Sequence, residues 1–247
     1  MPLRQRSQIL PLSWPIYELT MEEGNLTVEP VAYYRGSFGS KFGIPRQSSL
    51  AGSICGRIVF TDKYRVQEAL RGLEGFSHLW LIWGFSANKE AKGEWQPTVR
   101  PPRLGGNTAV GVWATRSPYR PNPIGLSCVE IEKISGCEIW VRGADLMDGT
   151  PIYDIKPYVS YADSRPEAVS GFAQDAPQGA LDVIIPENLP LDQRQRKALE
   201  EVLSLDPRPA YQDNPDREYA FPFEGRDIRF KVQGKVLTVT GYGTLKG

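Results

Sequence analysis

The sequence predicts a mainly β protein: a closed or nearly closed β-barrel in the N-terminal domain, followed by a small α+β C-terminal domain. Short strand-like runs separated by Gly and Pro recur through residues 26–161, with only one early helical pattern among them. A polar stretch over residues 162–180 follows, and after it come one amphipathic helical pattern and one hairpin pattern. We therefore expect a barrel domain over residues 1–168 and a C-terminal domain over 169–247.

The barrel strands are expected wherever β-branched and aromatic residues lie between turn signals. These runs cover residues 26–34, 53–60, 78–85, 109–114, 126–134, 138–142 and 152–161. The run "HLWLIWGF" at 78–85 is continuously apolar and short, which predicts a strand that is buried on both faces. The early helix is expected to begin after Asp62 as N-cap and to end at Gly75, with Val66, Ala69, Leu70 and Leu73 at helical spacing.

The C-terminal elements follow from two patterns. "LDQRQRKALEEVLSLDP" at 191–207 places Leu191, Ala198, Leu199, Val202 and Leu203 on one side of a helix that ends before Pro207. "DIRFKVQGKVLTVTGY" at 227–242 alternates apolar and polar residues on both sides of Gln233-Gly234. This alternation around a Gly-containing turn predicts a β-hairpin.

Composition excludes several classes of protein. The 247 residues are 40% hydrophobic and 23% charged, and 29 Lys and Arg balance 29 Asp and Glu, so no global charge demands a nucleic-acid partner. No apolar run approaches the roughly 18 residues that span a bilayer, and no apolar segment of a secretory signal follows residues 1–12. We therefore expect no membrane span and a cytoplasmic location. Three widely spaced cysteines favour buried thiols over a disulfide framework or a zinc site.

The loop "GVWATRSPYRPNPIGLS" at residues 111–127 is stiff, because its prolines fix φ and lack a backbone donor. No acidic residue occurs from Trp95 to Val129, whereas four arginines recur there: Arg100, Arg103, Arg116 and Arg120. This distribution predicts a positive patch on a rigid loop system. The alternative is a solvated loop with a chance bias of charge.

Few residues are available for the common catalytic arrangements. His78 is the one histidine of the chain, so a His-dependent triad would have to use it, and a site with several His ligands is impossible. Its position at the start of an apolar strand favours a structural role. Neither G-x-G-x-x-G nor G-x-x-x-x-G-K-[ST] occurs, so dinucleotide-binding and P-loop sites have no support from the sequence.

Two further clusters carry polar side chains in unusual patterns. In "DGTPIYDIKPY" at 148–158, Asp148 is expected to accept a bond from its own backbone downstream, as in a tight turn. Alternation places Asp154 and Lys156 on one face of a strand, where they either face a pocket or form a surface ion pair. In "GSKFGIPRQ" at 39–47, the side chains of Arg46 and Gln47 suit planar, bidentate recognition.

Taken together, these clusters resemble the TrmO family, also described as TsaA-like or YaeB-like. The resemblance rests on Pro45-Arg46-Gln47, "GLEGFSHLWLIW" (72–83), "TVRPPRLGGN" (98–107), the 111–127 loop, "DGTPIYDIKPY" and "DPRPAY" (206–211). It implies an S-adenosylmethionine-dependent methyltransferase on a β-barrel. Such an enzyme methylates N6 of threonylcarbamoyladenosine, just 3′ of the anticodon of a threonine tRNA, and works as a homodimer with the cofactor near the interface.

The resemblance also implies which residues form the site. The cofactor contacts are expected at Gln47, Phe85, Ser86, Arg116, Leu126, Ala144, Asp145 and Leu146. For contacts to the anticodon stem-loop we expect Arg103, Arg120, Asn122 and Lys156. No metal is expected, and Asp148 and Asp154 are candidates for a general base. The chain departs from the family pattern where Gly36-Ser37-Phe38 replaces Ser-Pro-aromatic and where Trp113 replaces a usual Phe.

Two other functions remain open at this point. A barrel methyltransferase acting on a small molecule would keep the cofactor but would need neither the arginine cluster nor the C-terminal domain. A non-enzymatic RNA-binding module would explain the arginines but not a cofactor pocket. Calorimetric titration with S-adenosylmethionine separates the second alternative from an enzyme.

Overall fold

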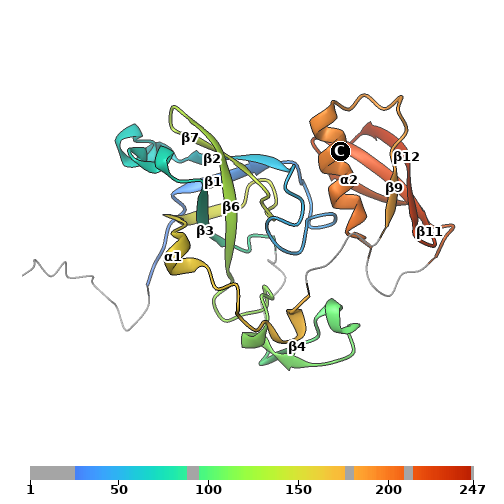
Figure 1. The fold of residues 1–247 in the computed structure, drawn as a ribbon, viewed down its shortest axis with the longest axis horizontal. Helices are drawn as coiled ribbons and strands as arrows, with labels where there is room; N and C mark the ends of the chain where they lie inside the picture. Colours follow the sequence, from blue (N-terminus) through green and yellow to red (C-terminus); the bar gives the residue numbers. More distant parts are fainter. Residues whose placement is uncertain (1–25, 88–94, 176–180, 209–213, 246–247) are drawn as a thin grey trace, which may run out of the picture.

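The computed structural model describes residues 26–87, 95–175, 181–208 and 214–245, and within these ranges it contains a closed six-stranded barrel (Figure 1). The strand order around the barrel is β1-β2-β7-β6-β3-β8. Its strands are β1 (Ala32–Gly36), β2 (Cys55–Phe60), β3 (His78–Gly84), β6 (Ile124–Ser135), β7 (Glu138–Arg142) and β8 (Pro151–Pro157). The mainly β fold class and the closed barrel are thus confirmed.

Antiparallel pairing of β1 with β8 closes the barrel, with Ala32 opposite Ile152. Alternate residues of each strand point inward and form one apolar core, as the period of two in a strand requires. This core includes Tyr34, Ile58, Leu79, Leu81, Val129, Ile139, Val141 and Ile152. β3 is the strand expected from "HLWLIWGF", but only alternate side chains are buried, because Trp80 and Ile82 lie half-exposed on its other face.

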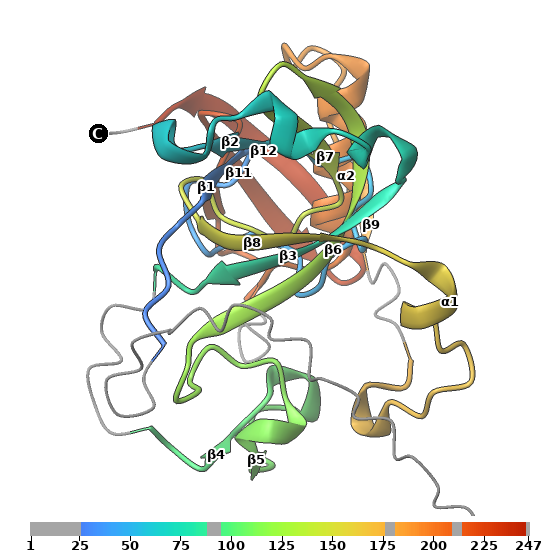
Figure 2. The same cartoon turned by 90° about the vertical axis from the view of Figure 1, so that its left-hand side faces the viewer.

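A separate lobe projects from one end of the barrel (Figure 2). It contains the two-stranded sheet of β4 (Thr98–Val99) and β5 (Val110–Gly111) and the 3₁₀ helices Pro102–Leu104 and Val112–Ala114. The strand expected over residues 109–114 is therefore only two residues long. The chain returns from this lobe into the barrel along β6.

The C-terminal part is a four-stranded sheet with one helix packed against it. The strand order is β10-β11-β12-β9, formed by β9 (Asp182–Ile184), β10 (Tyr219–Phe223), β11 (Arg226–Gln233) and β12 (Val236–Thr244). Helix α2 (Gln193–Ser204) begins with a capping box between Asp192 and Gln195. The predicted helix and the predicted hairpin around Gly234, where φ is +58°, are both confirmed.

The core of this C-terminal part includes residues from the N-terminal half of the chain. Phe38, Ala51 and Ile54, which lie between β1 and β2, pack in the same buried cluster as the sheet and α2. Phe38 also forms an isolated β-bridge with Phe223, and the Glu201 carboxylate accepts bonds from the backbone N and Oγ of Ser53, both at 2.8 Å. The boundary at residues 168 and 169 stays a prediction.

The early helix is the main error in the predicted elements. Residues 62–75 form three short 3₁₀ helices, Asp62–Tyr64, Gln67–Leu70 and Leu73–Gly75, and Asp62 caps none of them. Leu70 is the one buried side chain among them, so no continuous apolar face favours an α-helix.

Smaller differences concern element ends and the thiols. The first strand begins at Ala32 instead of residue 26, and β8 ends at Pro157, before the short helix α1 (Ser160–Asp163). The cysteines are free as expected, but they are half-buried rather than buried. None of the helices in the described ranges is long and apolar enough to cross a membrane.

Candidate functional site

Three segments that carry most of the predicted cofactor residues meet in the structure. They lie at the end of the barrel beside the projecting lobe. Phe85 and Ser86 follow the end of β3, and the Phe85 backbone N donates to the Pro123 carbonyl (3.0 Å), just before β6. The Ser49 backbone N donates to the Gly143 carbonyl (2.8 Å), which holds the segment after Gln47 against residues 143–150. Segments that are far apart in the sequence therefore meet around the start of β6.

A chain of hydrogen bonds runs from the barrel core to Asp145. The indole Nε1 of Trp83 donates to Ser127 Oγ (2.9 Å), and Ser127 Oγ donates to Asp145 Oδ1 (2.5 Å). Trp83 and Ser127 are both buried, and the Trp83 ring leaves no room for a Cβ at Gly125. Because the hydroxyl is fixed by a buried ring, it holds the Asp145 carboxylate in one orientation.

Asp145 is electrostatically coupled to the predicted loop arginine. Burial raises the pKa of the Asp145 carboxyl above its ordinary value, while the hydrogen bond from Ser127 and the positive charge of Arg116 oppose that rise. The Arg116 guanidinium is exposed and donates through Nη1 to Oε1 of Gln47. An acidic group, a cationic group and an amide thus lie together at an open edge of the barrel.

Apolar groups complete this region. The Phe85 ring lies edge-to-face against Trp83, with centroids 4.4 Å apart, and Leu126 is 52% exposed. Ala144 and Leu146, in contrast, are buried with the barrel core. Neither Ala144 nor Leu146 is therefore open to solvent beside Asp145.

The predicted substrate residues are more scattered. Arg120 donates to the carbonyls of Thr115 (2.6 Å) and Val112 (3.4 Å), and its guanidinium lies 5.3 Å from the centroid of the Trp113 ring. Arg120 therefore braces the 111–127 loop from within. Asn122 is exposed on the same loop.

The predicted substrate residue Lys156 is not brought to this edge. Lys156 lies opposite Trp80 in the β3–β8 pairing, four residues from the Gly84 end of β3. Its Nζ forms an ion pair with Asp154 (2.8 Å), and both side chains are about half-exposed, which confirms the surface-pair interpretation. Arg103 lies in the 3₁₀ helix of the lobe, and its side chain falls outside what the structure describes.

Asp148 does not form the turn contact expected from the sequence. Its carboxylate accepts from the Gly36 backbone N (3.1 Å) and lies 3.6 Å from the Arg35 guanidinium. The turn is closed instead by Thr150, whose N and Oγ1 both donate to the Met147 carbonyl. The backbone N of Asp148 donates to the Phe38 carbonyl (2.8 Å) and that of Gly149 to the Tyr34 carbonyl (2.9 Å), which holds this segment against β1 and its carboxylate near Gly36.

His78 is half-buried at the start of β3, where its Nδ1 lies 2.9 Å from Ser77 Oγ and its ring is tilted against Tyr158. These contacts agree with a structural role. Within the described ranges, no three His, Cys, Asp or Glu side chains are grouped so that they could hold a metal ion.

Sequence reasoning missed Trp83 and Ser127 as parts of the site. A usable signal was present, because Ser127 is a polar residue at an inward position of β6, between the inward Gly125 and Val129. A buried hydroxyl in an apolar strand face requires a partner.

Comparison with known proteins gives consistent matches over both parts of the chain. Residues 33–164 match the tRNA-methyltransferase O N-terminal domain, and residues 186–242 match the TrmO C-terminal domain. A tRNA (adenine(37)-N6)-methyltransferase of Escherichia coli K12 is 40% identical over 218 residues, which cover 83% of this chain and 92% of that protein. A protein of the same name from Eikenella corrodens is 41% identical over 178 residues, 70% of this chain and 99% of the relative.

A solved structure extends the likeness to three dimensions. The crystal structure of TrmO from Pseudomonas aeruginosa matches with a TM-score of 0.73 and 31% sequence identity. The match covers 89% of this chain and 98% of that one.

Proposed function

Because the chain belongs to the TrmO family of tRNA methyltransferases, we propose that it uses S-adenosylmethionine to N6-methylate threonylcarbamoyladenosine beside the anticodon of threonine tRNA. The observation that carries this proposal is the meeting of Gln47, Phe85, Arg116 and Asp145 at one edge of the barrel. These residues come from segments far apart in the sequence, and all were expected to contact the cofactor.

The side chains present fit the chemistry of S-adenosylmethionine. The Arg116 guanidinium offers charge-assisted donors to a carboxylate, and Asp145 offers an acceptor to an ammonium group. Phe85 and the exposed Leu126 offer apolar surface to an adenine ring. When bound, the cofactor supplies a methyl group that its sulfonium has already activated.

The protein's main task is therefore to align donor and acceptor. The Trp83–Ser127 hydrogen bond fixes Asp145, and Arg120 braces the loop that carries Arg116. In well-aligned reactions, positioning of this kind supplies up to roughly 7–11 kcal/mol of the barrier reduction. N6 must also lose a proton, and the two candidate bases are each held in an exposed ion pair, Asp148 with Arg35 (3.6 Å) and Asp154 with Lys156 (2.8 Å).

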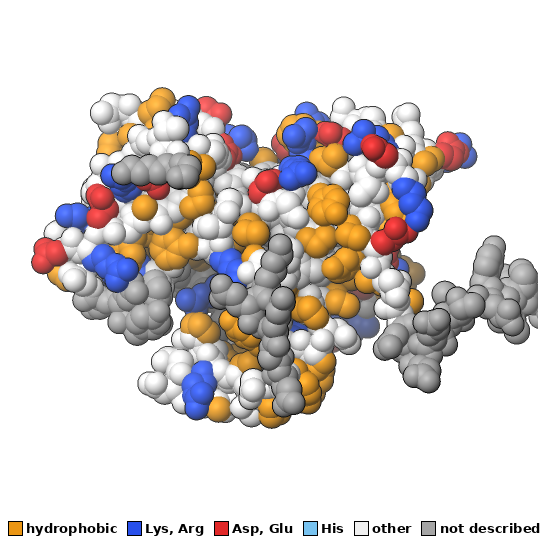
Figure 3. Space-filling model, turned by 180° about the vertical axis from the view of Figure 1, so that it is seen from behind, with side chains coloured by type: hydrophobic (Ala, Val, Ile, Leu, Met, Phe, Trp, Pro, Cys, Tyr) orange, Lys and Arg blue, Asp and Glu red, His pale blue; other side chains and the backbone are white. Residues whose placement is uncertain are grey.

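We further propose that the protein is a cytoplasmic homodimer. The support for a dimer is a group of large apolar side chains that the single chain leaves open to solvent near the projecting lobe (Figure 3). It consists of Trp95 (50% exposed), Trp113 (66%), Tyr119 (56%), Ile124 (46%) and Leu126 (52%). Since Leu126 belongs both to this group and to the candidate cofactor site, a second copy on this surface would also cover the cofactor. Light scattering at micromolar concentration is expected to give the dimer mass, and a monomer would contradict the proposal.

The decisive test of the activity is mass spectrometry of nucleosides from tRNA incubated with the protein and S-adenosylmethionine. We expect methylated threonylcarbamoyladenosine from modified threonine tRNA and no product from an unmodified transcript. The carboxylate of the threonylcarbamoyl group gives the arginines of the 111–127 loop a partner that plain adenosine lacks. Equal methylation of the unmodified transcript would contradict this substrate assignment.

Calorimetric titration with S-adenosylmethionine and the nucleoside analysis together separate the two other candidate functions. A non-enzymatic RNA-binding module would show no heat of S-adenosylmethionine binding. A small-molecule methyltransferase would bind the cofactor but would leave the tRNA nucleosides unchanged.

A further inference from the structure

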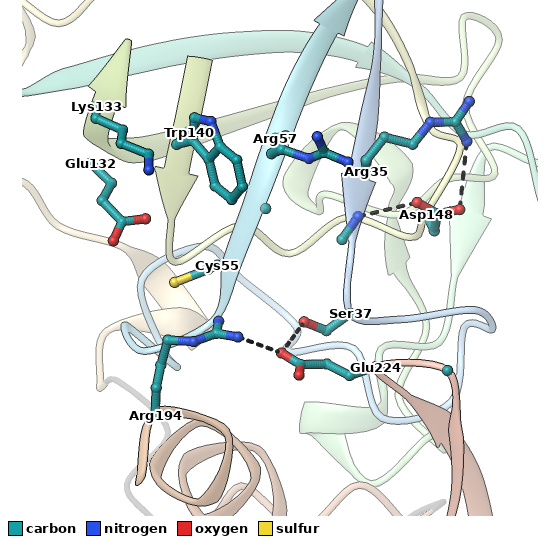
Figure 4. A pocket seen from close by; sticks show the side chains of 13 residues that line it. Arg35, Ser37, Cys55, Arg57, Glu132, Lys133, Trp140, Asp148, Arg194 and Glu224 are labelled. Atoms are coloured by element: carbon teal, nitrogen blue, oxygen red, sulfur yellow. Dashed lines mark hydrogen bonds and ion pairs between the residues drawn. The ribbon is translucent and has the colours of Figure 1, made fainter. Parts of the chain in front are cut away.

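A cavity of about 580 Å³ lies away from the candidate cofactor site, between the barrel and the C-terminal sheet (Figure 4). Strands β1, β2, β6 and β7 form one wall, and the start of α2 and the turn between β10 and β11 form the other. We call this cavity the interdomain cleft. Asp148 is the one lining residue that is also a candidate base for the methylation.

The cleft is lined by four cationic side chains: Arg35, Arg57, Lys133 and Arg194. Three of them form ion pairs with carboxylates, Arg35 with Asp148 (3.6 Å), Arg57 with Glu138 (3.2 Å) and Arg194 with Glu224 (3.4 Å). Lys133 has no ion pair with a described carboxylate, and its Nζ lies 4.6 Å from the centroid of the Trp140 ring.

These cations remain available to an anion in solvent. The arginine side chains are 41–50% exposed, and exposed ion pairs contribute little, so a phosphate can share a guanidinium that already contacts a carboxylate. In Figure 4 the Trp140 ring lies between Lys133 and Arg57, whose guanidinium is 5.1 Å from its centroid. The ring thus holds two cations side by side along one wall.

The two walls of the cleft are fixed relative to each other. Glu224, at the β10–β11 turn, accepts from Ser37 Oγ (3.3 Å) on the barrel side and from Gln195 Nε2 (2.6 Å) on α2. Its backbone N donates to the Ser37 carbonyl (2.8 Å). A cleft whose walls are already joined in this way binds a ligand without a large ordering cost.

The cleft is close to the candidate cofactor site along the chain. Residues 143–150 carry Asp145 at the cofactor site and Asp148 in the cleft, and these residues are separated by at most about 11 Å, the length of three extended residues. A nucleic-acid strand carries one phosphate for each nucleotide. Lys133, six residues beyond Ser127 on β6, lies at most about 20 Å from the candidate site. An RNA strand whose adenosine lies at the cofactor site therefore reaches the cleft with phosphates a few nucleotides away.

We propose that the interdomain cleft binds backbone phosphates of the tRNA strand next to the methylated nucleotide, with Lys133, Arg57 and Arg35 as the contacts. This inference rests on the proposed function, because it takes tRNA as the substrate. It assigns a role in substrate affinity to the junction between barrel and C-terminal sheet, separate from the cofactor contacts.

The test compares Lys133→Glu and Lys133→Ala with Lys235→Glu as a matched control. Lys133 is exposed and has no ion pair among the described residues, so its replacement leaves no carboxylate unpaired. Lys235 is also exposed but lies at the β11–β12 turn, at the opposite end of β11 from the cleft. The measurements are the Kd for modified threonine tRNA at several salt concentrations, the Kd for S-adenosylmethionine, kcat at saturating tRNA, and Tm.

We expect Lys133→Glu to weaken tRNA binding roughly tenfold and Lys133→Ala to weaken it less, with the slope of log K against log salt reduced by about one for the alanine variant. Cofactor affinity, kcat and Tm should stay unchanged, and Lys235→Glu should match the wild type. Wild-type tRNA affinity and salt slope in both Lys133 variants would overturn the inference while the function stands. A wild-type protein that binds cofactor but neither binds nor methylates tRNA would instead overturn the proposed function.

Discussion

Aromatic residues gather in two regions of this protein, and the two regions treat them in opposite ways. In the C-terminal core, Phe230 stacks on Tyr219 with centroids 5.4 Å apart, and both rings are buried. In the projecting lobe, Trp95 and Trp113 lie 6.1 Å apart, but they are 50% and 66% exposed. Ring contacts are thus similar, while the area removed from water differs greatly.

The difference separates a region that stabilises the chain from one whose rings stay open to solvent. Burial of apolar area, rather than the presence of a ring pair, provides most of the stabilisation. The aromatic side chains of the lobe and the adjoining loop are exposed, so they lower solubility and add little to the stability of the fold. We therefore expect substitutions in the first region to change unfolding and those in the second to change binding.

The largest expected effect is on stability. Phe230→Ala should lower the free energy of unfolding by about 3–5 kcal/mol, because it opens a cavity beneath Tyr219 and Phe221. Urea unfolding followed by fluorescence measures this loss. A loss below about 1 kcal/mol would mean that the C-terminal core collapses around the cavity. It would contradict the claim that the buried rings of this core stabilise the chain.

The next effect is on the cofactor. Arg116→Ala should weaken S-adenosylmethionine binding roughly 10- to 150-fold, since charge-assisted hydrogen bonds contribute about 1.5–3 kcal/mol. Thermal stability should barely change, because the guanidinium is exposed. Calorimetry of cofactor and tRNA binding on this one variant decides the assignment: normal cofactor affinity with a reduced salt slope for tRNA would place Arg116 on phosphate instead.

A smaller effect concerns the pH dependence of stability. Burial raises the pKa of Asp145 in the folded state, so its stabilising contribution is complete below the unfolded pKa, about 3.9, and is lost as the pH rises through the folded value. Asp145→Asn cannot ionise, so it does not lose stability as the pH rises. We expect the variant to exceed the wild type in Tm at pH 7 and to approach it at low pH, while cofactor binding falls. A Tm difference that is independent of pH would contradict burial of the carboxyl as the cause.

The smallest effect on stability is expected at Trp113. Trp113→Ala should change the free energy of unfolding by less than about 0.5 kcal/mol, although it removes a larger side chain than Phe230→Ala does. The same variant should weaken the proposed dimer, which analytical ultracentrifugation measures. A dimer of wild-type strength would indicate that the exposed rings of the lobe contact RNA or nothing at all.

Prediction from the sequence succeeded where a local pattern determines the structure. The hairpin at Gly234 and helix α2 each depend on neighbours within a few residues, and both were predicted. The helix predicted over residues 62–75 was wrong because local spacing does not determine which side chains are buried. The apolar residues there have helical spacing, but only Leu70 is buried.

The hydrogen bonds of the candidate site could not be predicted in this way. Ser127 is 44 residues from Trp83 and 18 from Asp145, and Asp148 bonds to Gly36 across 112 residues. Such contacts depend on the register of paired strands, which follows from barrel closure rather than from any local pattern. The resemblance to a family supplied most of the site residues, but it did not supply the contacts that hold them.

The packing of Phe38 and Ile54 in the C-terminal core also affects how the chain is made. Their partners are synthesised much later, since Ser37 and Glu224, which join the two parts, are 187 residues apart. At about 5–20 residues per second, the ribosome needs roughly 10–40 s to cover that distance. During this interval the nascent barrel carries an apolar patch that α2 and the C-terminal sheet cover later. A polypeptide released early by a premature stop codon would keep the patch exposed, and it would become a client of chaperones and proteases instead of a smaller enzyme.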